Sequence, residues 1–506
     1  DLDIIQANTK KKPTWIHFGA GNIFRAFMAV AQQKLLNEKI SDTGIIVCEG
    51  YDSEIIEKVY RKYDNLTIAV SMKQNGSMDK MVVGSVAESL LLKPETSDWL
   101  RLKEIFENPA LQMATFTITE KGYQIKNASG YLPQIKEDMQ VGPEQAKSYM
   151  GCLTALCYLR YLAGKLPLAL VSMDNFSHNG DRLKMAVLTI AEVWEKNNLV
   201  EEGFSGYLQD ETKISFPWSM IDKITPRPDS KIKEMLERTG LEGMDIFTTS
   251  ANTYIAPFVN AEETEYLVIE NNFPNGRPKL EHAGILFADR RTVECVEQMK
   301  VCTCLNPLHT GLAIFGCLLS YTSISKEMED PLLRELAVQI GQEGMPVVVH
   351  PGILEPKQFL HEVLYVRLPN PYIPDTPQRI ATDTSQKLSI RYGETIKAYQ
   401  KTGKSLEQLR AIPLVIAGWI RYLTGVDDFG NAMELSPDPR MTELREKISD
   451  IAEKPEMVAG SILADASVFG QDLSKTELAE PVIGFLKEML TGPHAVRKTL
   501  EKNLGQ

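Results

Sequence analysis

The sequence predicts two halves of different class, an N-terminal α/β half and a C-terminal half that is mostly helical. In the first 200 residues or so, short apolar runs alternate with helical patterns, which is typical of a parallel sheet covered on both faces. From about residue 290 onward, apolar residues recur at helical spacing. We therefore expect an α/β domain at 1–289, with an irregular extension at about 204–289, and a helical domain at 290–506.

The elements of both halves follow from these patterns. The first half is expected to contain strands at 15–18, 44–48, 66–71, 81–87, 113–119 and 168–173, and helices at 25–36 and 53–60. The extension is rich in Pro, Thr and Asn and contains one strand-like stretch at 266–269. The second half is expected to contain helices near 293–305, 310–320, 331–343, 356–367, 406–422 and 482–500.

Length and composition exclude several classes of protein. A chain of 506 residues with 43% hydrophobic and 24% charged residues is globular and needs two or three domains. The net charge is −12 and no basic tract is present, so we expect no nucleic-acid partner. No apolar run of about 18 residues and no signal-peptide pattern was found, which favours a cytoplasmic protein without a membrane span.

The seven cysteines are too few and too scattered for a disulfide framework, which favours a reducing compartment. Cys302 and Cys304 flank a single residue, but no C-x-x-C pair and no His pair at i, i+4 supplies the other ligands of a zinc site. We expect both to be buried thiols, and we expect no metal ion.

A glycine turn joins the first predicted strand to the first helix. Gly19 and Gly21 have the spacing of a dinucleotide-binding fingerprint, in which the glycines allow a tight turn and let a pyrophosphate approach the helix N-terminus. Phe24 occupies the place of the usual third glycine. The turn therefore predicts a Rossmann-type domain, while a simple strand–helix turn is the alternative, as is a methyltransferase that binds S-adenosylmethionine.

An acidic residue follows the second predicted strand. Asp52 could accept hydrogen bonds from the adenosine ribose, and its charge would repel a 2′-phosphate, which favours NAD over NADP. It lies 31 residues after Gly21, farther than the usual separation of about 20. The alternatives are that Asp52 or Ser53 caps a helix, or that Glu49 is the ribose partner.

Lys300, Asn306 and His309 lie in an otherwise apolar or small-residue segment. Apolar surroundings lower the pKa of a lysine toward the range of a general base. An asparagine amide can stabilise an alkoxide, and a histidine can orient a hydroxyl. The alternative is structural, with Asn306 capping the helix that Pro307 begins and His309 in the core.

Six motifs in order resemble the polyol-specific long-chain dehydrogenases, the family that includes mannitol 2-dehydrogenase and fructuronate reductase. The resemblance covers nearly the whole chain. The motifs are those at His17–Ala26, Thr117–Tyr123, Ser172–Gly180, Asp222–Pro226, Glu270–Gly284 and Lys300–His309. An Asn370-Pro371 pair and a basic pair eight residues apart, Arg379 and Lys387, resemble the family's substrate-contacting segment.

The resemblance implies a metal-independent dehydrogenase that uses NAD. Lys300 would be the general base, Asn179 and Asn306 would stabilise the alkoxide, Asp222 would pass the proton to solvent, and His309 would position the substrate. The implied cofactor contacts are Gly19, Ala20, Gly21, Asn22, Ile23, Phe24, Arg25, Asp52, Glu120 and Asn175. The implied substrate contacts are Asn370, Arg379 and Lys387.

One spacing departs from the family pattern. Five residues separate Lys300 from Asn306, where four are usual. In one continuous α-helix the extra residue would rotate Lys300 by roughly 100° relative to Asn306. A π-bulge could absorb the extra residue, and such bulges favour functional sites. Without it, the alternative is an NAD-binding protein that is catalytically impaired.

The expected substrate is a small linear sugar acid or polyol. We expect D-fructuronate/D-mannonate first, tagaturonate/altronate second and mannitol/fructose third. A sugar carboxylate favours an Arg or Lys clamp, for which Arg379, Lys387, Arg391 and Arg227 are candidates. The oligomeric state stays open.

Overall fold

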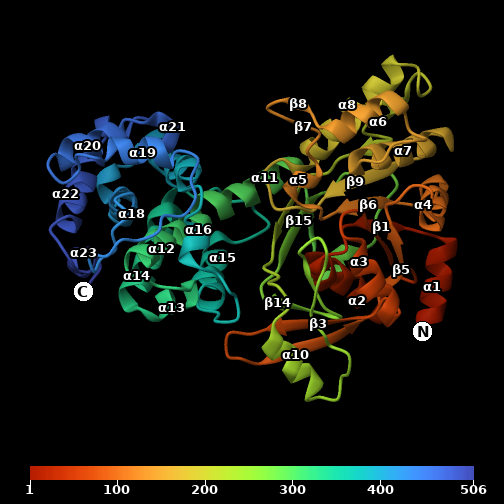
Figure 1. Cartoon of the computed structure of the whole chain (residues 1–506), viewed down its shortest axis with the longest axis horizontal. Helices are drawn as coiled ribbons and strands as arrows, with labels where there is room; N and C mark the ends of the chain where they lie inside the picture. Colours follow the sequence, from red (N-terminus) through yellow and green to blue (C-terminus); the bar gives the residue numbers. More distant parts are fainter. Residues whose placement is uncertain (506) are drawn as a thin grey trace. The chain divides into compact units, whose positions relative to one another are not determined.

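The computed structural model describes residues 1–505. These residues divide into two compact units, Asp1–Glu294 and the part that begins at Cys295. The N-terminal unit is built on a six-stranded sheet whose neighbouring strands are all parallel (Figure 1). In spatial order its strands are β10 (Ile214–Ser215), β9 (Leu168–Ser172), β6 (Met113–Phe116), β1 (Trp15–Phe18), β2 (Ile45–Glu49) and β5 (Val86–Leu91). The expected parallel sheet is confirmed.

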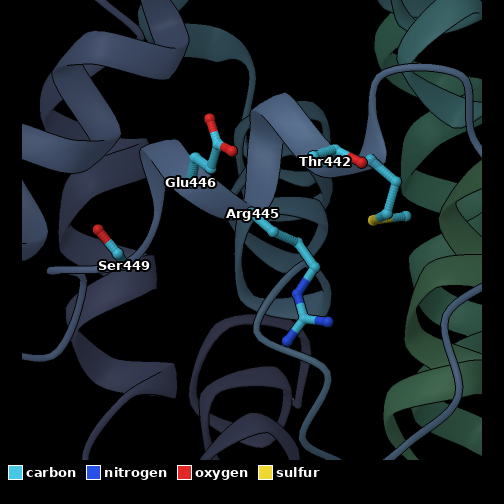
Figure 2. Close-up of a pocket in the computed structure, with 5 residues that line it drawn as sticks. Thr442, Arg445, Glu446 and Ser449 are labelled. Atoms are coloured by element: carbon cyan, nitrogen blue, oxygen red, sulfur yellow. The ribbon is translucent and has the colours of Figure 1, made fainter.

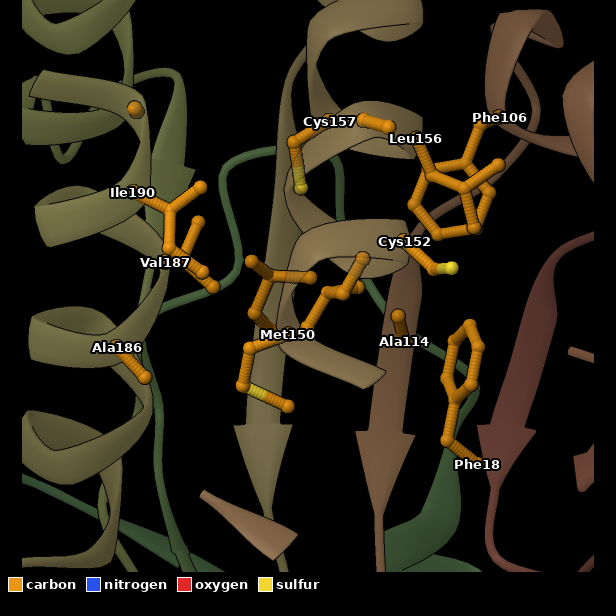
Figure 3. Close-up of a cluster of buried hydrophobic side chains, with 14 of the residues drawn as sticks. Phe18, Phe106, Ala114, Met150, Cys152, Leu156, Cys157, Ala186, Val187 and Ile190 are labelled. Atoms are coloured by element: carbon orange, nitrogen blue, oxygen red, sulfur yellow. The ribbon is translucent and has the colours of Figure 1, made fainter. Parts of the chain in front are cut away.

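Helices cover both faces of this sheet. Ile16 and Phe18 of β1 belong to a cluster with α4 (Ser97–Glu107), α7 (Tyr149–Leu162) and α8 (Asn179–Lys196), part of which is shown in Figure 3. Trp15 faces the opposite way and packs with η1 (Phe24–Met28), α2 (Ala29–Asn37) and η2 (Ile56–Tyr60). Burial on both faces explains why these strands show no polar alternation in the sequence.

The strand order reverses at β1. The chain runs outward from β1 through β2 to β5 on one side, and through β6 and β9 to β10 on the other. In open parallel sheets a ligand binds beyond the carboxyl ends of the strands at such a switch point. The loops that follow β1 and β6 begin at Gly19 and Thr117, so the fold places both at the expected nucleotide site.

Further strands form smaller sheets, in one of which a strand of the irregular extension pairs with a strand from the first 90 residues. These sheets are β14 (Phe258–Glu262), β3 (Thr67–Met72) and β4 (Met78–Val83); β11 (Ser219–Asp222), β15 (Tyr266–Glu270) and β16 (Leu286–Ala288); β12 (Phe247–Thr248) and β13 (Tyr254–Ile255); and β7 (Lys126–Asn127) and β8 (Gly130–Tyr131). The single strand expected at 81–87 was wrong. The strand is interrupted at Gly84 and Ser85, and the two parts, β4 and β5, belong to different sheets.

Other helices of the N-terminal unit lie around these sheets. They are α1 (Leu2–Lys11), α3 (Ser53–Ile55), η3 (Arg61–Tyr63), α5 (Thr119–Gly122), α6 (Pro133–Val141), α9 (Phe204–Gln209), α10 (Ser230–Glu237) and η4 (Leu280–Ala283). The strand expected to continue to residue 119 ends at Phe116, because Thr119 adopts a positive φ of 63° and begins α5.

The C-terminal unit is helical, as expected. The helix α11 (Arg290–Met299) leads into it, and α12 (Asn306–Leu318) packs against α14 (Pro331–Gly344), α16 (Pro377–Ile380) and α18 (Ala411–Tyr422). Its other helical segments are η5 (Lys300–Cys304), α13 (Ile324–Glu329), η6 (Met345–Val347), α15 (Pro356–Glu362), η7 (Val363–Arg367), η8 (Thr384–Gln386), η9 (Ser389–Gly393), α17 (Glu394–Lys401), η10 (Leu406–Gln408), α19 (Met441–Lys447), α20 (Pro455–Leu463), α21 (Ala466–Phe469), η11 (Leu473–Lys475), α22 (Ala479–Met489) and α23 (Ala495–Leu504).

The last expected helix, 482–500, is in fact two helices. Gly492 has a φ of 140° and Pro493 follows it, so the chain turns between α22 and α23. A glycine in such a conformation, followed by proline, ends a helix.

One helical run has the length and composition of a membrane span. Arg290–Leu318 covers 29 residues with a mean hydropathy of 1.4 in its most apolar window, although the sequence was expected to contain no such segment. The protein buries 78% of that window. A core helix of a globular protein passes the same test, and α12 is packed as such a helix.

Candidate functional site

The glycine turn has the backbone that the fingerprint requires. Gly19 has a φ of 106°, and a Cβ there would lie 2.2 Å from the carbonyl oxygen of Thr117. Its N–H donates to the Cys48 carbonyl at 2.8 Å, which ties the turn to β2. At Gly21, by contrast, an added Cβ would meet no atom within 4 Å. Packing therefore requires the first glycine, and the second leaves the backbone accessible, as close approach of a pyrophosphate demands.

Two buried carboxylates lie at the end of β2. Glu49 accepts from the backbone N–H of Ala20 at 2.8 Å and from that of Tyr51 at 2.7 Å, so it holds the glycine turn. Asp52 is the N-cap of α3 and also accepts from the hydroxyls of Thr249 and Thr253. The helix-cap interpretation of Asp52 is thus confirmed, and its contact with a ribose stays a prediction.

Phe24 fills the place of the third glycine. It is fully buried and stacks on the His17 ring, with centroids 4.3 Å apart. A glycine would let the helix sit close to the sheet, whereas here an aromatic ring separates them. The helix begins at Asn22 and passes into a single π-helical turn, η1, at Phe24.

A polar network lies beneath the turn. Trp15 Nε1 donates to Thr115 Oγ1, which lies 2.6 Å from His17 Nδ1, while His17 Nε2 lies 2.8 Å from Thr117 Oγ1. Because Trp15 can only donate, the Thr115 oxygen accepts from it, and both ring nitrogens of His17 have a threonine hydroxyl as partner. Burial lowers the pKa of His17 to about 3, so the ring stays uncharged.

The remaining residues of the turn differ in exposure. Ala20 is buried, while Asn22 and Ile23 are half-buried. Arg25 is fully buried and donates to the Ala256 carbonyl and to Asn22 Oδ1. Asn22 in turn donates to the Pro226 carbonyl. The guanidinium of Arg25 therefore supports the turn from inside the protein, and any contact with a dinucleotide would pass through Asn22.

The loops after β6 and β9 meet at Asp174. Its carboxylate accepts from the N–H groups of Ile118 and Thr119 at 2.9 and 3.0 Å and from the Tyr123 hydroxyl at 2.6 Å. Burial raises the pKa of Asp174. Next to this junction Glu120 and Asn175 are exposed, and Glu120 pairs with Arg182 at 3.3 Å.

Asn179 begins α8 and is buried. Its Nδ2 donates to the carbonyls of Asp174 and Ser219, both at 3.0 Å, and its Oδ1 accepts from the Ser219 N–H. The side chain thus joins the β9 loop to β11. Asp222, the last residue of β11, is buried in the same unit.

In the C-terminal unit, Lys300 lies on a π-helical turn. The turn η5 spans Lys300–Cys304 and closes with a bond of 3.0 Å from the Leu305 N–H to the Lys300 carbonyl, five residues back. Such a turn contains one residue more than an α-helical turn. The π-bulge expected from the spacing of Lys300 and Asn306 is therefore confirmed, and it absorbs the extra residue. Lys300 is buried, with 3% of its surface exposed.

Asn306 is the first residue of α12, after η5. The N-cap of α12 is Leu305, without a side-chain hydrogen bond, so the interpretation of Asn306 as a helix cap was wrong. Among residues 1–505 the side-chain amide of Asn306 has no hydrogen-bond partner. Its backbone carbonyl accepts from the Thr310 hydroxyl at 2.9 Å. His309 is half-buried one turn later. Asn306 and Thr310 are four residues apart and share a face of α12.

The predicted substrate segment places its residues differently. Asn370 is buried and its Oδ1 accepts from the Tyr372 N–H. Arg379 is exposed, with 70% of its side chain accessible, and is paired with Asp375. Lys387 is half-buried and donates to the carbonyls of Ile380 and Thr382. Burial, and then the charge of Arg391, lower the pKa of Lys387.

Comparison with known proteins decides the family. The model of the mannitol dehydrogenase Rossmann domain matches residues 13–282, and that of the mannitol dehydrogenase C-terminal domain matches 292–490. The chain belongs to the mannitol dehydrogenase family. It is 54% identical to a D-mannonate oxidoreductase of Thermotoga maritima over 514 residues, which cover 100% of this chain and 95% of the relative.

Two solved structures share the fold. A substrate-free D-sorbitol dehydrogenase is 24% identical, with a TM-score of 0.81 over 99% of this chain and 96% of the other. The Pseudomonas fluorescens mannitol 2-dehydrogenase, a ternary complex with NAD and D-mannitol, is 25% identical, with a TM-score of 0.68 over 97% of this chain and 94% of the other. The fold class and the resemblance expected from the motifs are confirmed.

Two other features of this mannitol dehydrogenase family member lie outside the predicted site. All seven cysteines are free thiols; Cys304 is fully buried and Cys302 half-buried, and residues 1–505 contain no group of three or more His, Cys, Asp or Glu placed to hold a metal ion. A surface hollow lies along α19, lined by Met441, Thr442, Arg445, Glu446 and Ser449 (Figure 2). It contains none of the predicted site residues.

The sequence interpretation missed the support of the glycine turn. His17 was used only as part of a motif, and Glu49 only as an alternative ribose partner. Their contacts with Thr115, Thr117 and Ala20 join segments 29 to 100 residues apart. The available signal was weak: a histidine inside an apolar strand, which predicts a buried polar network without identifying its partners.

Proposed function

We propose that this protein is an NAD-dependent oxidoreductase that interconverts D-mannonate and D-fructuronate. The observation that carries the proposal is the π-helical turn η5. It absorbs the extra residue between Lys300 and Asn306, which in one continuous α-helix would change the orientation of the two side chains relative to each other. The 54% identity to a D-mannonate oxidoreductase over the whole chain supports this substrate ahead of tagaturonate/altronate and mannitol/fructose.

The residues of the N-terminal unit fit a dinucleotide. Open space over Gly21 and the free N–H groups at the start of the helix suit the pyrophosphate. The carboxylates of Asp52 and Glu49 at the end of β2 favour NAD over NADP, because they would repel a 2′-phosphate. Bound NAD supplies the hydride acceptor in oxidation, and NADH the donor in reduction. The other proposed contacts are Ala20, Asn22, Ile23, Phe24, Glu120, Asn175 and, through Asn22, Arg25.

In this proposal Lys300 accepts the proton of the carbinol hydroxyl during oxidation and returns it during reduction. The amide of Asn306, which has no protein partner in the described chain, donates to the developing alkoxide. The Asn179 amide can also donate to the alkoxide, but only if it gives up its hydrogen bond to the carbonyl of Asp174 or of Ser219. Asp222 carries the proton onward to solvent. No metal ion is needed, because an ammonium and amides stabilise the charge.

His309, Asn370, Arg379 and Lys387 are proposed to contact the substrate. We also propose that the family's two domains in this chain are 1–289 and 290–506, which the compact units Asp1–Glu294 and Cys295–Gln506 support. The acidic composition and the absence of basic tracts support action in the cytoplasm on a small molecule, without nucleic acid or a membrane.

Steady-state rates with three ketoses test this function. NADH oxidation is measured with fructuronate, tagaturonate and fructose, and then NADPH replaces NADH. We expect the largest kcat/KM with fructuronate and NADH. A clear preference for fructose would refute the sugar-acid substrate, and a preference for NADPH would refute the cofactor.

Lys300→Ala tests the general base. We expect kcat to fall by about 10²- to 10⁴-fold, which is the usual contribution of a positioned acid or base. NADH affinity, followed by fluorescence titration, should stay unchanged, because the nucleotide contacts lie in the N-terminal unit. A wild-type protein that binds NADH but reduces none of the three ketoses would instead be a nucleotide-binding protein without this activity.

A further inference from the structure

Arg391 occupies a distinctive place in the C-terminal unit. It lies in the π-helical turn η9, which packs against the turn η5 that carries Lys300 and against α12. Its Nη1 donates to Thr310 Oγ1 at 2.6 Å, and that hydroxyl donates to the Asn306 carbonyl. The guanidinium is thus two hydrogen bonds away from Asn306, on the face of α12 that both residues share.

The charge of this guanidinium is not neutralised by the protein. The Thr310 hydroxyl is its single hydrogen-bond partner in residues 1–505, and no carboxylate of the described chain pairs with it. Burial lowers the pKa of Arg391 to about 10. A partly buried cation without a counter-ion costs stability, so its retention calls for an anionic ligand.

The other basic side chains of the segment are already engaged. Arg379 is exposed and bound to Asp375, and Lys387 donates to two backbone carbonyls. Arg227, the fourth candidate, lies in the N-terminal unit against the Tyr254 ring. Arg391 alone among the four is half-buried and also has donors that remain available, since neither Nε nor Nη2 bonds to a described residue.

We infer that Arg391 binds the carboxylate of the sugar acid and thereby selects sugar acids over neutral polyols. This rests on the proposed function. With Nη1 held by Thr310, Nε and Nη2 form the planar edge that pairs with both oxygens of a carboxylate. A neutral polyol would leave that edge unpaired, so the same residue attracts one class of substrate and disfavours the other.

The test compares Arg391→Gln and Arg391→Lys with Arg445→Gln, a control that removes an exposed arginine of the same unit. For R391Q we expect kcat/KM with fructuronate to fall by about 30- to 3,000-fold, mainly through KM, as for the loss of one partner of a buried charge pair. R391K keeps the charge but not the planar edge, so its loss should be smaller. R445Q should match the wild type.

Two further measurements separate this role from a structural one. The Tm of R391Q without ligand should stay level or rise, because the variant removes an unpaired buried charge. Calorimetry should show weaker binding of D-mannonate to R391Q and unchanged binding of NADH. A lower Tm with an unchanged fructuronate KM would overturn the inference and leave the proposed function intact. A wild-type enzyme that prefers fructose would overturn both.

Discussion

Of the π-helical turns in the described chain, η1 occurs where Phe24 departs from the usual dinucleotide fingerprint, and η5 occurs where the spacing before Asn306 departs from the family pattern. The two turns differ in what they enclose. The turn η1 follows the replacement of a glycine by Phe24, and every residue from Phe24 to Met28 is buried. The turn η5 contains the extra residue before Asn306, and it begins with a buried lysine. The first turn fits a bulky ring between helix and sheet, and the second sets the position of a reactive group. A π-turn alone therefore does not identify a functional site. The side chains on the turn show whether it has a role in packing or in chemistry.

Inserting one residue into η5 should have the largest effect. The π-turn already contains one residue more than an α-helical turn, so an alanine added after Val301 would rotate Lys300 by roughly 100° relative to Asn306. We expect kcat to fall by about 10²- to 10⁴-fold, as in Lys300→Ala. Val301→Ala, which keeps the length, is the control and should retain activity. Full activity in the insertion variant would show that the position set by η5 has no catalytic role.

Phe24→Ala probes the other turn. Loss of a fully buried phenylalanine should cost about 3–5 kcal/mol of stability, measured as a lower midpoint of urea denaturation. Phe429→Ala, at a ring that is 52% exposed, is the matched control and should change the midpoint little. Phe24→Gly would restore the common fingerprint. If it raised stability or NADH affinity, the packing role assigned to Phe24 would be wrong.

The two glycines of the turn should respond differently to alanine. Gly19→Ala should destabilise the protein by about 1–3 kcal/mol, because Gly19 has a positive φ and its added Cβ would overlap the Thr117 carbonyl. Gly21→Ala should leave the Tm unchanged and weaken NADH binding, since its Cβ would point into open space. Thermal denaturation and fluorescence titration of both variants test this contrast. Equal losses of Tm would contradict it.

Glu327 should produce the smallest effect, on the pH dependence of stability. It packs against Gly316 of α12, and neither carboxylate oxygen has a hydrogen-bond partner in the described structure. Burial raises its pKa well above 4.5, so the unfolded chain loses this proton at lower pH than the folded one. Glu327 makes its full contribution to the free energy of unfolding below the unfolded pKa. That contribution falls as the pH rises toward the folded pKa. Glu327→Gln should flatten the decline of Tm as the pH rises above the unfolded pKa; an unchanged slope would refute the assignment.

How far the sequence predicts the site depends on the range of the interactions involved. Gly19 and Gly21 were predicted from local spacing, and the η5 turn from a count of residues between Lys300 and Asn306. The η1 turn was not predicted, because Phe24 changes volume without changing the count. Arg391 could not be ranked above Arg379, since the difference in their exposure and partners belongs to the folded chain and not to the local pattern.

The same limit applies to Asn179. Its type and motif suggested an alkoxide-binding amide, but its donors are engaged by Asp174 and by Ser219, 40 residues away in the chain. No local pattern contains that partner. The fold class was easier to predict, because alternation of strands and helices is a property of short segments repeated many times.

The apolar helix α12 has a consequence for the protein during its synthesis. Its partner α18 lies roughly 100 residues further along the chain, so the ribosome needs about 5–20 s to complete α18 after α12. Until then the face of α12 that packs against α18 is uncovered in the nascent chain, where chaperones or neighbouring chains can reach it. Substitutions in α18, remote from the chemistry, should therefore reduce the yield of folded enzyme while leaving the turnover of each folded molecule unchanged.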